Sequence, residues 1–183
     1  KPAEIVAAPA PAPAPAPAGI ERALDLLEAA ERPAILAGGG AWFSGAGSAL
    51  VAFAERIGAP VFSNAKAHGL VPADHPLCGR GFATLAIAGQ AGKAEADCVL
   101  VVGARLGLFT GGRSGRLIPS RARVIQIDID AAEIGRNREI DVGIAADCRE
   151  TLAALDAAAA RRSFRDHRAW IETVQKVRHA HRF

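Results

Sequence analysis

Short apolar runs that end in Gly, Arg or Asp constrain the fold of this chain more than any other feature. The run CVLVVGA spans residues 98–104, ARVIQIDID spans residues 122–130, and VGIAAD spans residues 142–147. Strands that are buried on both faces of a parallel sheet have this composition, with turn residues at their carboxyl ends. Because ligands in such sheets bind just beyond the carboxyl ends, the segment 101–147 is the first place to look for a binding site.

Strand-like and helix-like segments alternate along the chain. This alternation is typical of a doubly wound α/β fold, with a mostly parallel, Rossmann-like sheet of five or six strands and helices on both faces. The remaining expected elements are helices at 20–33, 44–58, 82–96 and 148–160, strands at 34–40 and 59–64, a loop at 66–81 and a helical turn at 131–137. Residues that commonly begin or end helices flank these elements. Ser44 or Ser48 is expected to cap the start of the second helix, and Gly58 is expected to end it. Asp130 is expected to cap the turn, and Asp147 the last helix.

The N-terminal residues 1–18 are expected to be an Ala/Pro linker between domains. Six of the eleven prolines lie within the first 17 residues, where alternating Ala and Pro favours an extended spacer over a helix. The segment lacks the bulky apolar core of a signal peptide, and no run is long and apolar enough to predict a membrane span. With 183 residues, no Met and Lys at position 1, we expect one domain cut from a longer protein.

The C-terminal residues 161–183 carry most of the positive charge. Apolar residues at 164, 171, 174 and 177 have helical spacing, which predicts a basic amphipathic helix with its charges in solvent. Nucleic-acid binding would need basic residues interleaved with stacking aromatic rings, so no nucleic-acid partner is expected. The seven basic residues here are Arg161, Arg162, Arg165, Arg168, Lys176, Arg178 and Arg182, against the acidic Asp166 and Glu172.

The cysteines and histidines give no metal site. Cys78, Cys98 and Cys148 are odd in number and lack metal-ligand spacing, which favours a reducing, cytoplasmic location. His179 and His181 have no accompanying ligands, and a metal needs three or four.

Three glycines, Gly38, Gly39 and Gly40, directly follow the strand at 34–37 and allow two interpretations. Their backbone could approach a pyrophosphate, or the turn could pack against the sheet. The spacing is not G-x-G-x-x-G, and no G-K-[ST] follows, so neither a dinucleotide fingerprint nor a P-loop is predicted.

Arg105 also has two possible roles. Its guanidinium could grip a phosphate beside Gly103 and Ala104, while Asp128 or Asp130 accepts hydrogen bonds from a ribose. Alternatively, Arg105 pairs with one of these aspartates and joins the strand ends. The residues alone leave both possibilities open.

Several segments in order resemble a known family. AERPAILAGGG, GAPVFSNAKAHGLVPADHPLCGRG, DCVLVVGARLG, ARVIQIDIDAAEIGRN and DVGIAADCRETLAAL resemble the central domain of thiamine-diphosphate-dependent enzymes of the acetolactate synthase family. GARLGLFTGGRSGRLIP is similar to benzaldehyde lyase and its relatives in particular. The resemblance covers roughly residues 19–160, so residues 161–183 are expected to lead to a third domain.

This resemblance implies that the chain is the noncatalytic middle of a three-domain enzyme that acts on 2-keto acids or aldehydes. In the family, thiamine diphosphate is held by the first and third domains, and Mg²⁺ by a G-D-G motif of the third, which this sequence lacks. No catalytic residue and no metal ligand is therefore expected here. The implied partners are the other two domains, and the implied parent is a homodimer or homotetramer.

The resemblance also implies a vestigial nucleotide site. Relatives bind FAD or ADP in this domain, or no nucleotide in the case of benzaldehyde lyase. Where typical acetolactate synthases read G-A-R-F-D-D-R, this chain has Leu106 to Phe109 after Arg105, which disfavours FAD. The matching positions are Gly39, Gly40, Ser63, Asn64, Gly103, Ala104, Arg105, Asp128 and Asp147. The alternative function is a free-standing Rossmann-like nucleotide-binding module.

Overall fold

The computed structural model of the protein describes residues 11–92, 95–110 and 116–180. Four expected features lie partly outside the described residues: the linker at residues 1–10, the expected helix 82–96 at residues 93–94, the motif similar to benzaldehyde lyase at residues 111–115, and the end of the tail with His181 and Arg182.

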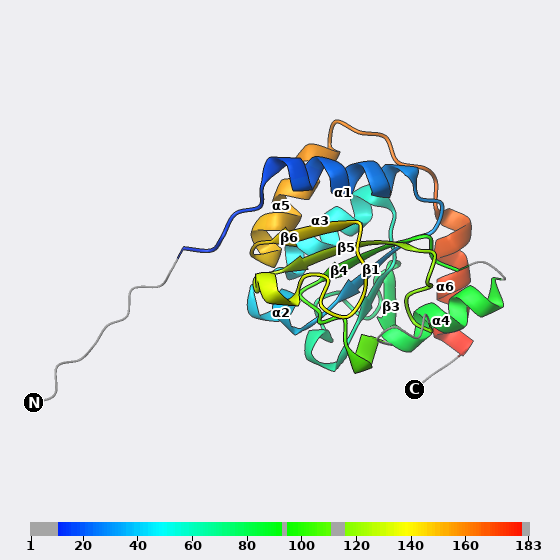
Figure 1. Ribbon diagram of the computed structural model, residues 1–183. Helices are drawn as coiled ribbons and strands as arrows, with labels where there is room; N and C mark the ends of the chain where they lie inside the picture. Colours follow the sequence, from blue (N-terminus) through cyan, green and yellow to red (C-terminus); the bar gives the residue numbers. More distant parts are fainter. Residues whose placement is uncertain (1–10, 93–94, 111–115, 181–183) are drawn as a thin grey trace, which may run out of the picture.

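A single sheet of six parallel strands forms the centre of the fold (Figure 1). Its spatial order is β3-β2-β1-β4-β5-β6, so the order reverses between β1 and β4, where chain connections leave in opposite directions. This arrangement confirms the expected doubly wound fold. The strands are β1 (Pro33–Ala37), β2 (Val61–Ser63), β3 (Cys78–Gly81), β4 (Cys98–Val102), β5 (Arg123–Asp128) and β6 (Val142–Ala145).

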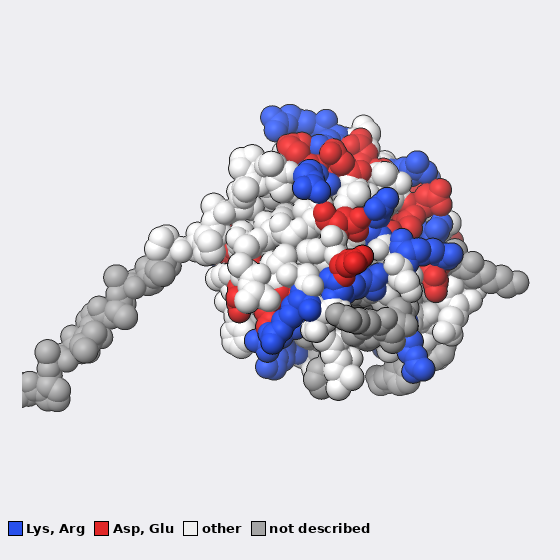
Figure 2. All heavy atoms as spheres, viewed as in Figure 1, with Lys and Arg blue, Asp and Glu red and all other residues white. Residues whose placement is uncertain are grey.

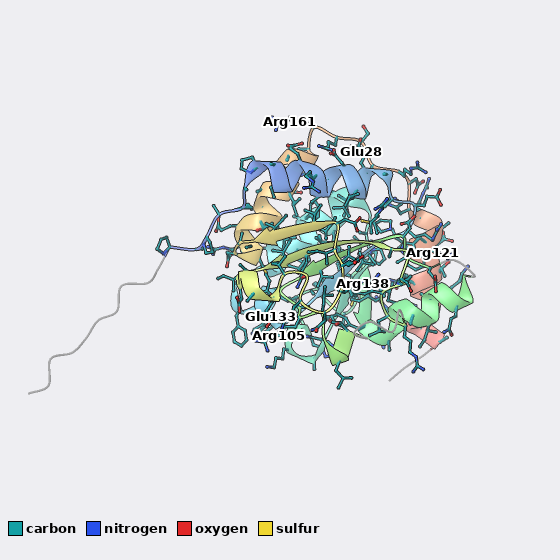
Figure 3. The ribbon with its side chains drawn as sticks, in the orientation of Figure 1. Glu28, Arg105, Arg121, Glu133, Arg138 and Arg161 are labelled. Atoms are coloured by element: carbon teal, nitrogen blue, oxygen red, sulfur yellow. The ribbon has the colours of Figure 1, made fainter. Side chains whose placement is uncertain are left out.

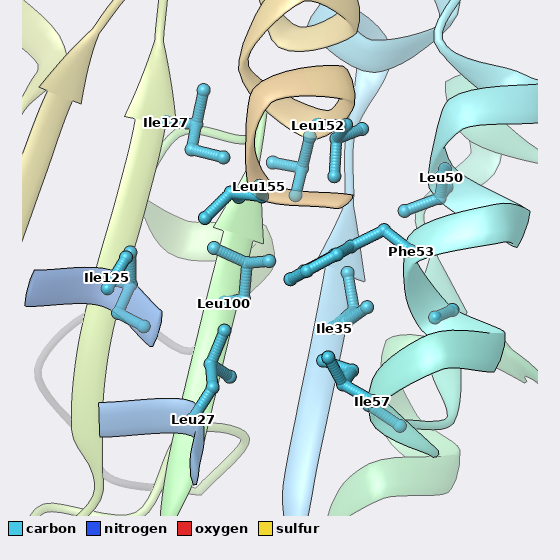
Figure 4. Close-up of a cluster of buried hydrophobic side chains, with 14 of the residues drawn as sticks. Leu27, Ile35, Leu50, Phe53, Ile57, Leu100, Ile125, Ile127, Leu152 and Leu155 are labelled. Carbon is cyan, nitrogen blue, oxygen red and sulfur yellow. The ribbon is translucent and has the colours of Figure 1, made fainter. Parts of the chain in front are cut away.

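Helices cover both faces of the sheet. Alternate residues of each strand point to opposite faces, so Ile35 and Leu100 pack under one layer while Leu36 and Val99 pack under the other. The first layer is α1 (Pro17–Ala29), α3 (Gly47–Ile57) and α5 (Cys148–Ala159); the second is α4 (Phe82–Ala91) and α6 (Arg168–Ala180). Figure 4 shows the first core, where Phe53 of α3 lies among side chains from the sheet and from α5.

Strand β3 was not expected, because its residues were assigned to the loop 66–81. CGRG carries no apolar run, and Arg80 has a positive φ of 60°. Gly79 explains the pairing with β2: a Cβ at this position would lie 2.5 Å from the Phe62 ring, so only glycine lets the edge strand come this close.

The expected helix 44–58 is present as α3, from Gly47 to Ile57, and a second helix that was not expected lies just before it. A short helix α2 (Gly39–Phe43) precedes α3, and neither serine caps: Ala46 occupies the N-cap position, and the Ser44 hydroxyl donates to the Ala41 carbonyl. The Gly58 end signal is confirmed, with φ of 64° in the left-handed region.

The two acidic caps are also confirmed. Asp130 accepts from the Ala132 N–H at the start of the turn η3 (Ala131–Glu133), and Asp147 accepts from the N–H groups of Arg149 and Glu150 at the start of α5. Two other short turns, η1 (Ala65–Ala67) and η2 (Leu108–Thr110), complete the described elements.

The first helix starts inside the expected linker. Helix α1 begins at Pro17, where a proline suits the first helical turn because it has no N–H to leave unpaired. Further upstream, the Asp147 N–H donates to the Pro13 carbonyl at 2.9 Å. The end of the 1–18 segment is therefore attached to the domain beside the start of α5.

The tail helix is part of the core. It begins at Arg168, so Phe164 lies outside it, and Trp170, Val174 and Val177 are buried against the second face of the sheet. The Trp170 indole N–H donates to the Pro33 carbonyl at 2.9 Å. The apolar core thus continues past the expected boundary at residue 160.

The prediction that all charges of this helix face solvent was wrong for Arg178. Its side chain is buried, and its guanidinium donates to the carbonyls of His75 and Cys78. A guanidinium has five donors and can hold two carbonyls at once, so Arg178 attaches the end of α6 to the start of β3.

One further basic residue of the tail is paired with α1. Arg162 forms ion pairs with Glu21, Asp25 and Glu28, which lie on one face of that helix. On the face seen in Figure 2, Lys and Arg are interspersed with Asp and Glu, and Figure 3 labels Glu28 of this group. Pairing within the fold accounts for this part of the basic tail without an external polyanion.

Truncation after residue 160 should therefore unfold the domain. Each large apolar side chain that is fully buried contributes about 1.5–3 kcal/mol, so losing Trp170, Val174 and Val177 removes at least about 4 kcal/mol. Domains have only about 5–15 kcal/mol in total. Urea titration followed by circular dichroism should show no cooperative transition for residues 1–160, whereas a chain ending at Ala180 should unfold cooperatively. Equal stability of the two chains would contradict a core role for α6.

Candidate functional site

The candidate site residues all lie at the carboxyl edge of the sheet, where they make different kinds of contact. They occupy the ends of five strands: Gly39 and Gly40 follow β1, Ser63 and Asn64 end or follow β2, Gly103, Ala104 and Arg105 follow β4, Asp128 ends β5, and Asp147 follows β6. This placement is the edge at which doubly wound sheets bind ligands.

The glycine turns after β1 and β4 pack directly against each other. The Gly40 N–H donates to the Gly103 carbonyl at 2.9 Å, and the Gly38 N–H donates to the Val102 carbonyl at 2.8 Å. A Cβ on Gly38 would lie 2.4 Å from the Gly103 oxygen, and one on Gly103 would lie 2.4 Å from the Ala41 nitrogen. The structure thus shows the packing of the glycine turn against the neighbouring turn, which is one of the two interpretations left open by the sequence.

Arg105 pairs with a residue that the sequence did not single out. Its Nε lies 3.5 Å from Oε1 of Glu133, and the same oxygen accepts from Arg136 at 2.8 Å (Figure 3). The ion pair of Arg105 is therefore with η3 and not with Asp128 or Asp130. Glu133 has a side chain only 7% exposed, whereas the two guanidinium groups are largely in solvent.

Gln126 positions Glu133. It is fully buried in the middle of β5, where its side-chain amide donates to the Glu133 carbonyl at 3.0 Å and its oxygen accepts from the Gly135 N–H at 2.9 Å. A buried amide needs such partners. The lone glutamine in the apolar run RVIQID was the signal that could have drawn attention to the 131–137 turn.

Asp128 and Asp147 both accept hydrogen bonds from backbone N–H groups a few residues further along the chain. One oxygen of Asp128 accepts from the Asp130 N–H at 3.0 Å, and Asp147 is the buried N-cap of α5. Cys148, next to Asp147, is also buried, and burial followed by the nearby Asp147 and Asp128 carboxylates raises the pKa of its thiol to about 12. A thiol with this pKa stays protonated at neutral pH and is a poor nucleophile.

Asn64 is the least satisfied of the candidate residues. Its side-chain oxygen is buried and has no hydrogen-bond partner within the described part of the chain, while its backbone N–H donates to the Ala37 carbonyl at 3.2 Å. Gly39, across the loop, faces Lys66: a Cβ on Gly39 would lie 3.4 Å from the Lys66 side chain.

A groove of about 680 Å³ lies at the opposite, amino edge of the sheet, lined in part by Arg121, Arg123, Arg138 and Asp141. Figure 3 labels Arg121 and Arg138 there. Arg123 donates to Asp141 at 2.7 Å. Burial opposes ionisation of Asp141, yet hydrogen bonds from the Val124 N–H and from Arg123 outweigh it and hold the pKa of this carboxyl below its ordinary value. These charges join the starts of β5 and β6.

The described residues offer neither a metal-binding cluster nor a membrane-spanning helix. Residues 11–92, 95–110 and 116–180 contain no group of three or more His, Cys, Asp or Glu side chains arranged to hold a metal ion. No helix in these ranges is both long and apolar enough to cross a membrane.

Comparison with known proteins identifies relatives of this chain. The family model described as "Thiamine pyrophosphate enzyme, central domain" matches residues 20–155. The "Probable acetolactate synthase large subunit" of Methanocaldococcus jannaschii is 34% identical over 168 residues, 87% of this chain and 27% of the relative. The sulfoacetaldehyde acetyltransferase of Castellaniella defragrans is 37% identical over 139 residues, 74% of this chain and 23% of the relative.

A solved structure from Mycobacterium smegmatis, described as a candidate thiamin diphosphate-dependent enzyme, superimposes with a TM-score of 0.67 at 27% sequence identity. The superposition covers 83% of this chain and 29% of that one. The chain thus spans about a quarter of the length of the relatives that it matches.

Substituting Gly103→Ala should destabilise the domain strongly. Gly103 has φ of 58°, which costs an alanine about 1–2 kcal/mol, and the clash with Ala41 adds about 1–3 kcal/mol. Gly107→Ala is the matched control, because no atom lies within 4 Å of the added Cβ, and its effect should stay within about 1 kcal/mol. Urea unfolding of both variants measures the difference. A Gly103→Ala variant as stable as Gly107→Ala would refute the close contact of the two turns.

Proposed function

The chain belongs to the family of thiamine pyrophosphate enzymes, as a central domain of that family, and we propose that its parent enzyme makes or breaks carbon–carbon bonds at 2-keto acids or aldehydes. The names of an acetolactate synthase and a sulfoacetaldehyde acetyltransferase among the relatives support this substrate class. The match of residues 20–155 to a domain of larger enzymes speaks against a free-standing nucleotide-binding module.

Thiamine diphosphate and Mg²⁺ bind, in this proposal, to other parts of the parent enzyme. The residues present here do not fit either group: the described part holds no cluster of metal-ligating side chains, and the sequence has no G-D-G. The role of this chain in the proposal is noncatalytic, to support the domains that carry the cofactor.

The carboxyl edge is proposed to be a vestigial nucleotide site. Arg105 and Asp128 keep groups that could meet a phosphate and a ribose. Two observations weaken the site: the Gly40 N–H is already bonded to Gly103, and the buried Glu133 carboxylate faces Arg105. A phosphate here would meet the negative charge of the buried Glu133 carboxylate.

We further propose a cytoplasmic parent that is a homodimer or homotetramer. The cytoplasmic location is supported by three cysteines that are all buried and form no disulfide: Cys78, Cys98 and Cys148. Burial, followed by the nearby Asp97 and Asp141 carboxylates, raises the pKa of the Cys98 thiol to about 12, in keeping with a core residue.

Calorimetric titration of the chain with thiamine diphosphate and Mg²⁺ should give no saturable heat, because none of the described residues form a site for them. The intact parent should bind both and should convert a 2-keto acid or an aldehyde only in their presence. Micromolar binding to the chain alone would place cofactor residues within it, and a parent without thiamine-dependent turnover would refute the proposed reaction class.

Nucleotide titration should separate the roles of Arg105 and Glu133. The chain should bind ADP with a dissociation constant on the order of 1 mM or weaker, about −4 kcal/mol, and should retain no FAD. Arg105→Ala should abolish this binding, and Glu133→Gln should strengthen it by removing the negative charge. Arg121→Ala, at the opposite edge of the sheet, is the control and should change nothing. A yellow protein with stoichiometric flavin would contradict the vestigial site.

A further inference from the structure

Four large apolar side chains are exposed in the described part of the chain, and all four follow strands at the carboxyl edge. Trp42 and Phe43 follow β1, Leu108 follows β4, and Ile129 follows β5, and these three strands are neighbours in the sheet. Their exposed fractions are 49%, 82%, 87% and 61%, in that order. Scattered apolar side chains are ordinary on protein surfaces, but a group of large ones at one edge marks an interaction surface.

The backbone holds these side chains outward on fixed loops. Phe43 ends α2, which is attached through the contact of Gly40 with Gly103. Leu108 opens η2, where the Thr110 hydroxyl donates to the Arg105 carbonyl at 3.0 Å and accepts from the Gly107 N–H at 2.8 Å.

Ile129 lies in a turn closed by the hydrogen bond from the Asp130 N–H to the Asp128 carboxylate. A surface on loops that are already ordered loses little conformational entropy when it is covered. The four side chains are therefore held on ordered loops after three neighbouring strands, and together they are here called the edge patch: Trp42, Phe43, Leu108 and Ile129.

We propose that the edge patch is the docking surface for the domain that precedes the 1–18 linker in the parent polypeptide. This inference rests on the proposed function, since it needs a parent with further domains. The largely exposed guanidinium groups of Arg105 and Arg136 lie at the same edge of the sheet, where both pair with Glu133. The partner surface accordingly offers apolar side chains to the patch and acidic side chains to these two guanidinium groups.

The positions at which the two ends of the chain meet the domain indicate which domain covers the edge patch. The upstream segment meets the domain at the carboxyl edge, where Pro13 accepts from the Asp147 N–H beside β6. The downstream end lies at the amino edge, where Arg178 near the end of α6 donates to the carbonyl of Cys78, the first residue of β3. Figure 1 shows the two ends leaving the fold on different sides. A domain upstream of the linker is therefore tethered near the edge patch, whereas a downstream domain is tethered away from it.

The Ala/Pro sequence upstream of α1 favours an extended tether. A chain in the polyproline conformation rises about 3.1 Å per residue, so the residues from Lys1 to Pro13 would span about 40 Å in that conformation. That reach allows a preceding domain to cover the edge while the tether keeps its local concentration high.

Photo-crosslinking in the intact parent tests the occupant. Phe43 is replaced by p-benzoylphenylalanine, which keeps an aromatic side chain at a mostly exposed position. Irradiation should join it to a peptide upstream of Lys1, within the same polypeptide. The same replacement at Arg121, on the amino edge, should give no such product. A product with a second copy of the chain or with a segment after Phe183, or no product at all, would overturn the proposal.

A second measurement keeps the test decisive if the replacement of Phe43 disturbs the fold. The double variant Phe43→Ser, Leu108→Ser should leave urea unfolding of the 183-residue chain unchanged, because both side chains are exposed, but should speed proteolytic cleavage of the linker in the parent. Unchanged cleavage would overturn docking. Thiamine-dependent turnover is assayed on the same parent. A parent that forms the cross-link but is inactive refutes the proposed reaction and supports the docking surface. A parent that is active but forms no cross-link supports the proposed reaction and refutes the docking surface.

Discussion

The contact between the turns after β1 and β4 controls the carboxyl edge of this domain. Gly38 and Gly40 meet Gly103 backbone to backbone, at distances that leave no space for a side chain. The contact lies where the strand order reverses, the point at which a doubly wound sheet opens a crevice. Here the protein's own main chain occupies that point, and α2 and the Arg105 loop are fixed on either side of it.

Local signals predicted the parts of the fold that depend on local interactions. The runs CVLVV and RVIQID are strands because only the interior of a parallel sheet accommodates them, and Asp130 and Asp147 cap because their carboxylates reach N–H groups two and three residues ahead. Strand β3 could not be predicted in this way. It has no apolar run, and its place depends on Gly79 fitting against Phe62, 17 residues earlier in the sequence.

The candidate site shows the same division. A parallel sheet gathers the carboxyl ends of its strands, so the sequence was sufficient to place the candidate residues at one edge. Their partners were not predictable, because Glu133 reaches Arg105 only through the turn that Gln126 holds from inside β5. Arg178 is a similar case: helical spacing puts it beside Val174 and Val177, but only the position of β3 decides that it is buried.

The late position of α6 in the sequence has a consequence for synthesis. The first face of the sheet has all three of its helices once α5 ends at Ala159. The second face keeps Leu36 and Val99 under α4 alone until Trp170 and Val177 have left the ribosome. Since chains emerge from the amino end, one side of the sheet stays open to water after the other is closed, and during this interval the nascent domain exposes apolar surface to chaperones or to other chains.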